Sequence, residues 1–479
     1  MSDFLVYYER VSPTTWVYLS SLLMISLFFK FNRLWSVRNL DLIGLILLAP
    51  GLLFVIYGQE RGTAAYEQTG YIWLFAIGGL FLIRMLLDPL MVRRPLLEPN
   101  LSVGGLTFLG LSLLIFLMAN VATDKPAERL SIKRLSAEAA ELTVSENPSA
   151  TPTDAGRDKL ENPPAEEPLA LFGPGYPWVF EIFQLPTRIL FQGAQQTTQP
   201  SSASVGGNRS AEELATARTV AIVSYLAIVI GLVVIGYRHF DNIKTGIAAA
   251  VLYLLLPYIA ILTGRYMDTA DRIGQVYHVL LAALLVWAIV LYRRPLVSGV
   301  LLGLAIGMFY YPIFLLPLWC SFYWQRGVAR FATGVISMLV LLVAILYFHP
   351  YVSFSADVRQ MFGWVFPRME NLKGFWRLSF NDPVYRIPVL AAFVAMCLTL
   401  MIWPAQKNLG TLMSCSAAVM LGIQFWHPLG GGLLLGWYLP LVLLTIFRPN
   451  LEDRVALSVL TPWSFARRKP NLRAVDQAA

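Results

Sequence analysis

Residues 293–330 read RRPLVSGVLLGLAIGMFYYPIFLLPLWCSFYWQRGVAR. The apolar part, 296–325, is about 30 residues long, whereas one transmembrane helix needs roughly 20. It is therefore too long for one upright span and too short for two. Pro312 and Pro317 interrupt its middle, where each removes a helical hydrogen bond. This pattern predicts a helical hairpin of two half-spans whose ends lie on the same side. One long, tilted and kinked helix is the alternative.

The composition around this stretch is that of a membrane protein with several spans. Hydrophobic residues make up 57% of the 479 residues and charged residues only 14%. Apolar runs long enough to enter a membrane recur along the chain. They lie at 14–31, 40–57, 70–91, 103–121, 217–237, 246–263, 275–292, 296–325, 331–348, 387–404, 409–426 and 431–447.

Basic loops indicate the orientation, because Lys and Arg gather on the cytoplasmic side of a membrane. If 296–325 were a single span, the basic segment 326–330 would lie outside and every later loop would be inverted. A hairpin keeps all basic loops on one side, together with the basic tail 448–479. We therefore expect an all-α polytopic protein with about eleven full spans and one re-entrant hairpin. Its N-terminus would lie outside and its C-terminus in the cytoplasm.

The net charge of +8 does not indicate nucleic-acid binding. Its Lys and Arg residues cluster at the ends of apolar runs, where they contact lipid headgroups, so membrane lipids are the expected partners. The three cysteines, Cys320, Cys397 and Cys415, all lie in apolar segments and suggest neither a disulfide framework nor a metal site. The oligomeric state is not indicated by any pattern.

The polar segment 122–216 divides by composition. Residues 127–168 are rich in Ala, Glu, Ser, Thr and Pro and predict a flexible insertion. Residues 169–193 mix aromatics, prolines and a few charges, which is typical of helices lying flat at the membrane interface. With the topology above, both belong to a long outer loop.

Charged residues within or beside the spans are few. Arg84 and Asp88 lie four apart and share a helix face, so an ion pair at the inner headgroup level is expected and a proton or ion site is the alternative. Asp124 follows the fourth run, where a partly desolvated carboxylate can act as a general base; an ordinary helix-end charge is the other interpretation.

The next outer loop reads GRYMDTADR. Its acids Asp268 and Asp271, flanked by Arg265 and Arg272, can bind a hydroxylated or phosphorylated group. Alternatively they pair with each other as a helix cap, with Asp268 or Thr269 capping the helix that follows. His278 lies one turn further on and, as a single His, is more simply structural.

The outer loop 349–386 carries five cations interleaved with tryptophans. Cations are not favoured on this side by topology, so they indicate an anionic ligand, with outer headgroup contact as the alternative. Arg suits bidentate phosphate contacts and Trp suits stacking on a sugar. These residues are Arg359, Arg368, Lys373, Arg377 and Arg386, with Trp364 and Trp376.

The pattern resembles the GT-C superfamily of integral-membrane glycosyltransferases, especially the polyprenyl-phosphate-mannose-using family 87. Four stretches carry the resemblance: a span followed by a long outer loop with an early Asp124, then LYLLLPYIAILTGRYMDTADRIGQVYHVLLAALLVWAIVLYRRP, LVSGVLLGLAIGMFYYPIFLLPLW and HPLGGGLLLGWYLPLVLL. It covers 103–447, so 1–102 forms a separate three-helix extension. Two departures stand out: Met308-Phe309-Tyr310 fills the place of a Lys, and Gly430-Gly431-Gly432 replaces polar residues.

The resemblance implies transfer of a hexose from a polyprenyl-phosphate donor to an acceptor on the outer face of a bacterial inner membrane, with inversion. Asp124 would take the acceptor proton, with Asp268 and Asp271 as further candidates, and Tyr310 and Tyr311 would contact sugar or lipid. No cofactor or metal is implied. Donor-phosphate contacts would come from Arg265, Arg272, Arg359, Arg368, Lys373 and Arg377. The alternatives are an inactive relative and a transporter or flippase for a lipid-linked or anionic solute.

Overall fold

The structure is a computed structural model of the chain. It describes residues 11–91, 97–123, 205–262, 276–348, 353–363, 374–378, 382–405, 407–428 and 431–449, together with residue 372 and a few positions between 175 and 184. Side chains at 60, 205–214, 260–262, 276–277 and 356 are not described.

Every regular element in these residues is a helix. One isolated bridge, Gly374 to Gly431, is the sole β-type pairing within the described ranges. Seven helices are long and apolar enough to cross a membrane. They are 37–59 (in α3, Val37–Arg61), 64–90 (α4, Ala64–Leu87, with the 3-10 turn η2, Asp88–Leu90), 103–123 (α5, Val103–Thr123), 215–238 (in α8, Val205–Arg238), 328–348 (α14, Val328–Phe348), 383–402 (α16, Arg386–Ile402, with the 3-10 turn η5, Pro383–Tyr385) and 409–426 (α17, Leu409–Trp426). The expectation of a helical membrane protein is confirmed at this level; the count of eleven spans stays a prediction.

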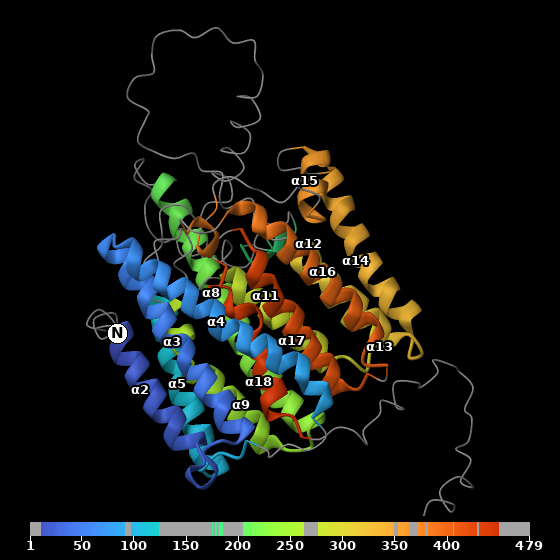
Figure 1. Ribbon diagram of the computed structural model, residues 1–479. Coiled ribbons are helices and arrows are strands. Elements are labelled where there is room, and N and C mark those ends of the chain that lie inside the picture. The colour runs from blue at the N-terminus through green and yellow to red at the C-terminus, as the bar shows by residue number, and fades with distance from the viewer. Residues whose placement is uncertain are drawn as a thin grey trace, which may run out of the picture.

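Shorter helices occupy the other apolar runs. They are α2 (Pro13–Phe28), α9 (Ile243–Leu255), α10 (Pro257–Leu262), α11 (Val276–Val290), α12 (Pro295–Met308), α13 (Leu316–Tyr323) and α18 (Leu439–Phe447). Figure 1 shows them as a bundle, with α2, α3 and α4 side by side on one flank and α14 with the short α15 (Phe354–Met361) on the other.

The stretch 293–330 folds back on itself. Helix α12 ends at Met308, the 3-10 turn η3 (Tyr311–Leu315) follows, and α13 returns. The Tyr323 hydroxyl at the end of α13 donates to the Tyr292 carbonyl just before α12, at 2.6 Å. A Cβ on Gly327 would lie 3.6 Å from the Pro295 ring. The two ends of the run therefore meet, which confirms a hairpin and excludes one kinked helix. Its depth in a membrane stays a prediction.

Small residues hold α12 against α14. Gly299, Gly303 and Gly307 lie four apart on one face of α12, and Gly334 of α14 packs against the same helix. A Cβ on Gly303 would lie 2.9 Å from the Val335 carbonyl oxygen, and one on Gly299 or Gly334 would be closer still to the facing backbone. This is the small-residue packing by which helices approach closely in membranes.

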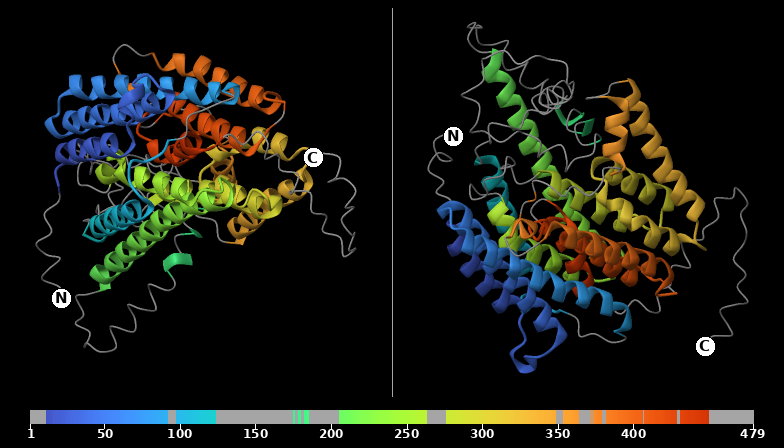
Figure 2. Two further views of the ribbon diagram at one scale, coloured as in Figure 1. Left: turned by 90° about the horizontal axis from the view of Figure 1, so that it is seen from below. Right: turned by 45° about the horizontal axis from the view of Figure 1, so that its top comes forward.

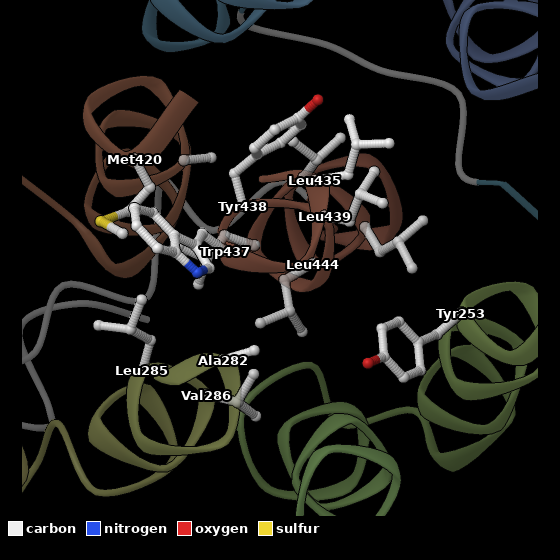
Figure 3. Packing of buried hydrophobic residues seen from close by; sticks show 14 of the residues in the cluster. Tyr253, Ala282, Leu285, Val286, Met420, Leu435, Trp437, Tyr438, Leu439 and Leu444 are labelled. Carbon is white, nitrogen blue, oxygen red and sulfur yellow. The ribbon is translucent and has the colours of Figure 1, made fainter. Parts of the chain in front are cut away.

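Helix α17 is the central helix of the bundle. Every residue from Leu409 to Gln424 is buried. Helix α18 and the turn η6 (Leu435–Trp437) pack beside it, and Figure 3 shows Trp437 near Met420 of α17 and Leu285 of α11. The bundle has two opposite ends, the break end and the tail end. The break end carries the hairpin break and the start of α18, and the tail end carries the hairpin ends and Phe447.

The first three helices pack directly on this centre. Phe28 of α2 makes an edge contact with Phe447 of α18, with ring centroids 5.9 Å apart, and Phe75 of α4 does the same with Phe425 of α17 at 5.3 Å. The two views in Figure 2 agree with this arrangement.

A chain of ion pairs ties these helices together at the tail end. Arg84 contacts Asp41 through Nε (2.9 Å) and Asp88 through Nη1 (2.8 Å), so the predicted Arg84–Asp88 pair is confirmed. Arg448, which follows α18, contacts the other oxygen of Asp88 at 2.6 Å. The Asp88 side chain is fully buried. Two acids and two bases therefore neutralise one another, which is the condition under which charges are tolerated in a buried position.

Candidate functional site at the hairpin break

The helix of the hairpin stops where three aromatic residues follow one another. Phe309 has an extended backbone, and the rings of Tyr310 and Tyr311 contact each other with centroids 4.0 Å apart and planes tilted by 30°. The Tyr311 ring is buried and faces His427 at 5.0 Å, Trp437 at 5.1 Å and Trp426. Backbone freed from a helix at membrane depth has to be buried in protein or line a cavity. These rings provide that burial.

The end of α17 meets the break and is capped by side chains from the predicted ligand-binding loop. Arg386 is only 2% exposed, and its guanidinium donates to the Trp426 carbonyl from Nε (3.2 Å) and Nη2 (3.0 Å). The Trp376 indole donates to the Phe425 carbonyl at 3.1 Å. A cation at a helix C-terminus is favourable because the last carbonyls lack partners and carry partial negative charge. The two contacts fix the flank of the loop against the bundle.

The helix α15 is joined to the same place through one glycine. Gly363 has φ +65°, a left-handed backbone that glycine adopts without strain. A Cβ here would lie 2.6 Å from the Tyr310 ring, so the α15 end rests directly on the break. Arg359 of α15 is exposed, as is Arg377 of η4 (Phe375–Arg377). Neither forms an ion pair with any carboxylate in the described part of the chain.

Two further helix interruptions lie next to the hairpin break. The α9 helix ends at Leu255 and α10 begins at Pro257, and a loop separates α17 from α18. The Gln424 amide holds that loop: Oε1 accepts from the backbone of Gly432 (2.9 Å) and Leu434 (3.1 Å), and Nε2 donates to the Leu434 carbonyl. His278 packs on Trp437 at 5.5 Å. Three discontinuities thus come together around Trp437.

Among the described residues, two buried donors in this cluster find no acceptor. They are the indole nitrogens of Trp426 and Trp437, neither of which finds a hydrogen-bond partner among the residues described. Buried donors are normally satisfied, so each unpaired one calls for an explanation. A bound molecule with hydroxyl oxygens could provide the acceptors.

The structure describes only some of the predicted site residues. Asp124, Arg265, Asp268, Asp271, Arg272, Trp364, Arg368 and Lys373 lie outside the described residues, so their places stay predictions. Tyr310, Tyr311, Trp376, Arg359 and Arg377 all lie at the break end. Tyr311 and Trp376 are buried, and Arg359 and Arg377 are exposed.

Sequence reasoning missed three members of the cluster. Arg386 was one of five loop cations, but its capping role depends on a carbonyl 40 residues later. His427 follows directly after the apolar run 409–426, and Trp437 lies within the run 431–447, so neither stands out from its apolar surroundings in the sequence. Gly431, one of the glycines noted as a departure from the resemblance, has a packing role, because a Cβ there would collide with the Gln424 carbonyl oxygen.

Within the described ranges no group of three or more His, Cys, Asp or Glu side chains is placed to hold a metal ion. Comparisons with protein-family models, with curated proteins and with solved structures gave no match to this chain, so its function is argued from these residues.

Proposed function

We propose that this protein is a membrane glycosyltransferase that moves a hexose from a polyprenyl-phosphate donor to an acceptor at the break end of the bundle. One observation carries the proposal: the loop expected to bind a phosphate packs against the hairpin expected to contact the sugar. Gly363 rests on Tyr310, and Arg386 and Trp376 cap the helix whose end faces Tyr311.

The chemistry requires cations that are free to meet a phosphate. In sugar transfer the bond between the anomeric carbon and the donor phosphate breaks, and its electron pair leaves with the phosphate. Positive groups aimed at that phosphate stabilise the charge as it grows. Arg359 and Arg377 are exposed and have no carboxylate partner among the described residues, so their donors are available. Buried Arg386 instead positions the loop.

The acceptor side of the reaction is assigned to a carboxylate. Asp124 follows directly after α5, which ends at Thr123 at the break end. As a general base it would remove the acceptor hydroxyl proton while the oxygen attacks the anomeric carbon from the face opposite the phosphate, which inverts that carbon. Asp268 and Asp271 are the further candidate carboxylates of this proposal.

A transfer assay tests the proposal. Protein in liposomes is given a polyprenyl-phosphate hexose labelled in the sugar, and the label is followed into a non-donor product. Asp124→Asn should lower the rate by about 10²- to 10⁴-fold, the usual contribution of a general base. The matched control is Asp382→Asn, an exposed acid that caps a short turn, and it should leave the rate near wild type. Equal rates for wild type and Asp124→Asn would remove Asp124 from the mechanism.

The proposal includes an orientation, with the break end outside a bacterial inner membrane and the tail end in the cytoplasm. In a background without Cys320, Cys397 and Cys415, a membrane-impermeant thiol reagent should modify Ser355→Cys in α15 on intact cells. It should modify Gln325→Cys, in the turn after α13, only after lysis. Both positions are exposed. Modification of Gln325→Cys alone on intact cells would invert the assignment.

A transporter or flippase is the second candidate, and one observation favours it. Broken helices that meet inside a bundle form the substrate sites of many transporters, and three breaks meet around Trp437. Against it, the buried charges at Asp41, Arg84, Asp88 and Arg448 neutralise one another and leave no net charge to carry an ion. Movement of the labelled donor across the liposome without any transfer product would favour this candidate.

A further inference from the structure

A small cavity opens at the break end between α3 and α4, away from the hairpin. Its volume is about 280 Å³, and it is lined by Phe54, Tyr57, Arg61 and Tyr66. The cavity lies in the three-helix region that the glycosyltransferase resemblance does not cover. It therefore requires its own explanation.

The walls of this cavity are built rigidly. A Cβ on Gly58 would lie 2.5 Å from the Glu67 backbone nitrogen, so α3 and α4 touch here without a side chain between them. Gly62, with φ +63°, turns the chain from one helix to the other, and the Thr63 nitrogen donates to the Gly58 carbonyl at 2.9 Å. From α2, Thr14 forms a hydrogen bond with the Tyr57 hydroxyl. The site is therefore fixed before any ligand arrives.

Arg61 is the charged residue among those that line the cavity. The Arg61 guanidinium lies over the Tyr57 ring, 5.7 Å from its centroid. It makes no ion pair within the described part of the chain, and its side chain is exposed. Stacking on a ring leaves the edge donors of a guanidinium free, and those donors match the oxygens of a phosphate in pairs.

An apolar stripe leads away from the cavity along α4. Tyr66 (44% exposed), Trp73 (36%), Leu80 (63%) and Leu87 (45%) recur every seven residues and so share one helix face. At 1.5 Å per residue the stripe is about 32 Å long, close to the hydrocarbon thickness of a bilayer. An acyl chain leaving the cavity would find this face beside it.

We infer that this cavity binds the phosphate headgroup of an anionic phospholipid, with an acyl chain along the Tyr66–Leu87 face of α4. The volume is at the low end of small-molecule sites, which suits a headgroup and not a complete sugar-lipid donor. Charge selects the class of lipid: Arg61 favours an anionic headgroup over a zwitterionic one, whose ammonium would face the guanidinium. The inference does not depend on the proposed transferase activity.

The test is retention of lipid by the purified full-length protein. Protein is exchanged into nanodiscs of phosphatidylglycerol in phosphatidylcholine, released, and weighed by native mass spectrometry. Wild type should keep phosphatidylglycerol in preference to phosphatidylcholine. Arg61→Gln should lose that preference by about tenfold, the effect of one charge-assisted hydrogen bond. Arg61→Lys, which keeps the charge but not the paired donors, should fall between the two.

Arg330→Gln is the matched control, because Arg330 is equally exposed but lies at the tail end. It should retain the lipid as wild type does. Equal losses in Arg61→Gln and Arg330→Gln would show general charge attraction and overturn the site. Displacement of phosphatidylglycerol by inorganic phosphate at equal concentration would also overturn it, by assigning the cavity to free phosphate. Arg61→Gln should leave the rate of sugar transfer unchanged. A failure of the lipid-binding proposal can therefore be distinguished from a failure of the proposed transferase activity.

Discussion

The buried ion pairs of the tail end contrast with two exposed arginines at the break end. At the tail end, Arg84 and Arg448 each contact Asp88, and Asp41 completes a neutral set of two acids and two bases, all largely buried. At the break end, Arg359 and Arg377 are exposed and contact no carboxylate among the described residues. Matched buried charges hold helices together, whereas unmatched exposed ones are available to a ligand. Under the proposed function, the ion pairs at the tail end are structural, and Arg359 and Arg377 at the break end bind the donor phosphate.

The strongest way to break this comparison is to unbalance the tail end. Asp88→Ala leaves Arg84 and Arg448 buried without their shared carboxylate. Removing one partner of a buried ion pair costs about 3–5 kcal/mol of unfolding free energy. Arg330→Gln is the control, since Arg330 is exposed at the same end and has no ion-pair partner among the described residues, and its change should stay within about 0.5 kcal/mol. The measurement is unfolding in detergent with increasing denaturant. Similar stability of the two variants would mean that the ion pairs do not hold this end together.

Some contacts of the two ends could be predicted from the sequence and others could not. The hairpin was predictable, because its length, prolines and basic flanks all concern one continuous stretch. The Arg84–Asp88 pair was predictable from a spacing of four. The extension to Asp41 and Arg448 was not, because Arg448 meets Asp88 across 360 positions and no local pattern records such a contact. The same holds for Arg386, whose acceptor is the Trp426 carbonyl.

The break end can be loosened at a single glycine. Gly363→Ala places a methyl group 2.6 Å from the Tyr310 ring and forces a left-handed backbone on alanine, which should cost about 1–3 kcal/mol. Gly62→Ala isolates the backbone effect, since Gly62 has φ +63° but open space around it. Gly79→Ala, in the interior of α4 with nothing within 4 Å of the added methyl group, should stabilise the protein slightly.

If α15 is needed to place Arg359, only Gly363→Ala should also reduce sugar transfer. Equal transfer by all three variants would separate α15 from the site.

Removing the unmatched cations should affect binding and not folding. Arg359→Ala and Arg377→Ala should leave the unfolding free energy within about 0.5 kcal/mol, as expected for exposed positions without partners. Each should weaken use of the donor about tenfold, the value of one charge-assisted contact to a phosphate. The measurement is kcat/KM for donor in the transfer assay, beside a denaturation curve. A loss of stability without a loss of transfer would reverse the roles assigned to the two ends.

The smallest expected effect concerns His239, a buried side chain at the tail end. His239, between α8 and α9, is buried, and its Nε2 lies 2.9 Å from the Val290 carbonyl oxygen, which a neutral ring can satisfy by donating. Burial lowers the pKa of His239, and the nearby Arg293 and Arg238 act in the same direction. Because its folded pKa lies below the unfolded value, the unfolded chain binds more protons as the pH falls below about 6.5. Stability should therefore decline with acidification from that point and level off below the folded pKa.

His239→Gln keeps a donor for Val290 but does not titrate, so it should flatten this part of the pH profile of the denaturation midpoint. An unchanged slope in the variant would show that other groups govern the acid sensitivity of this end.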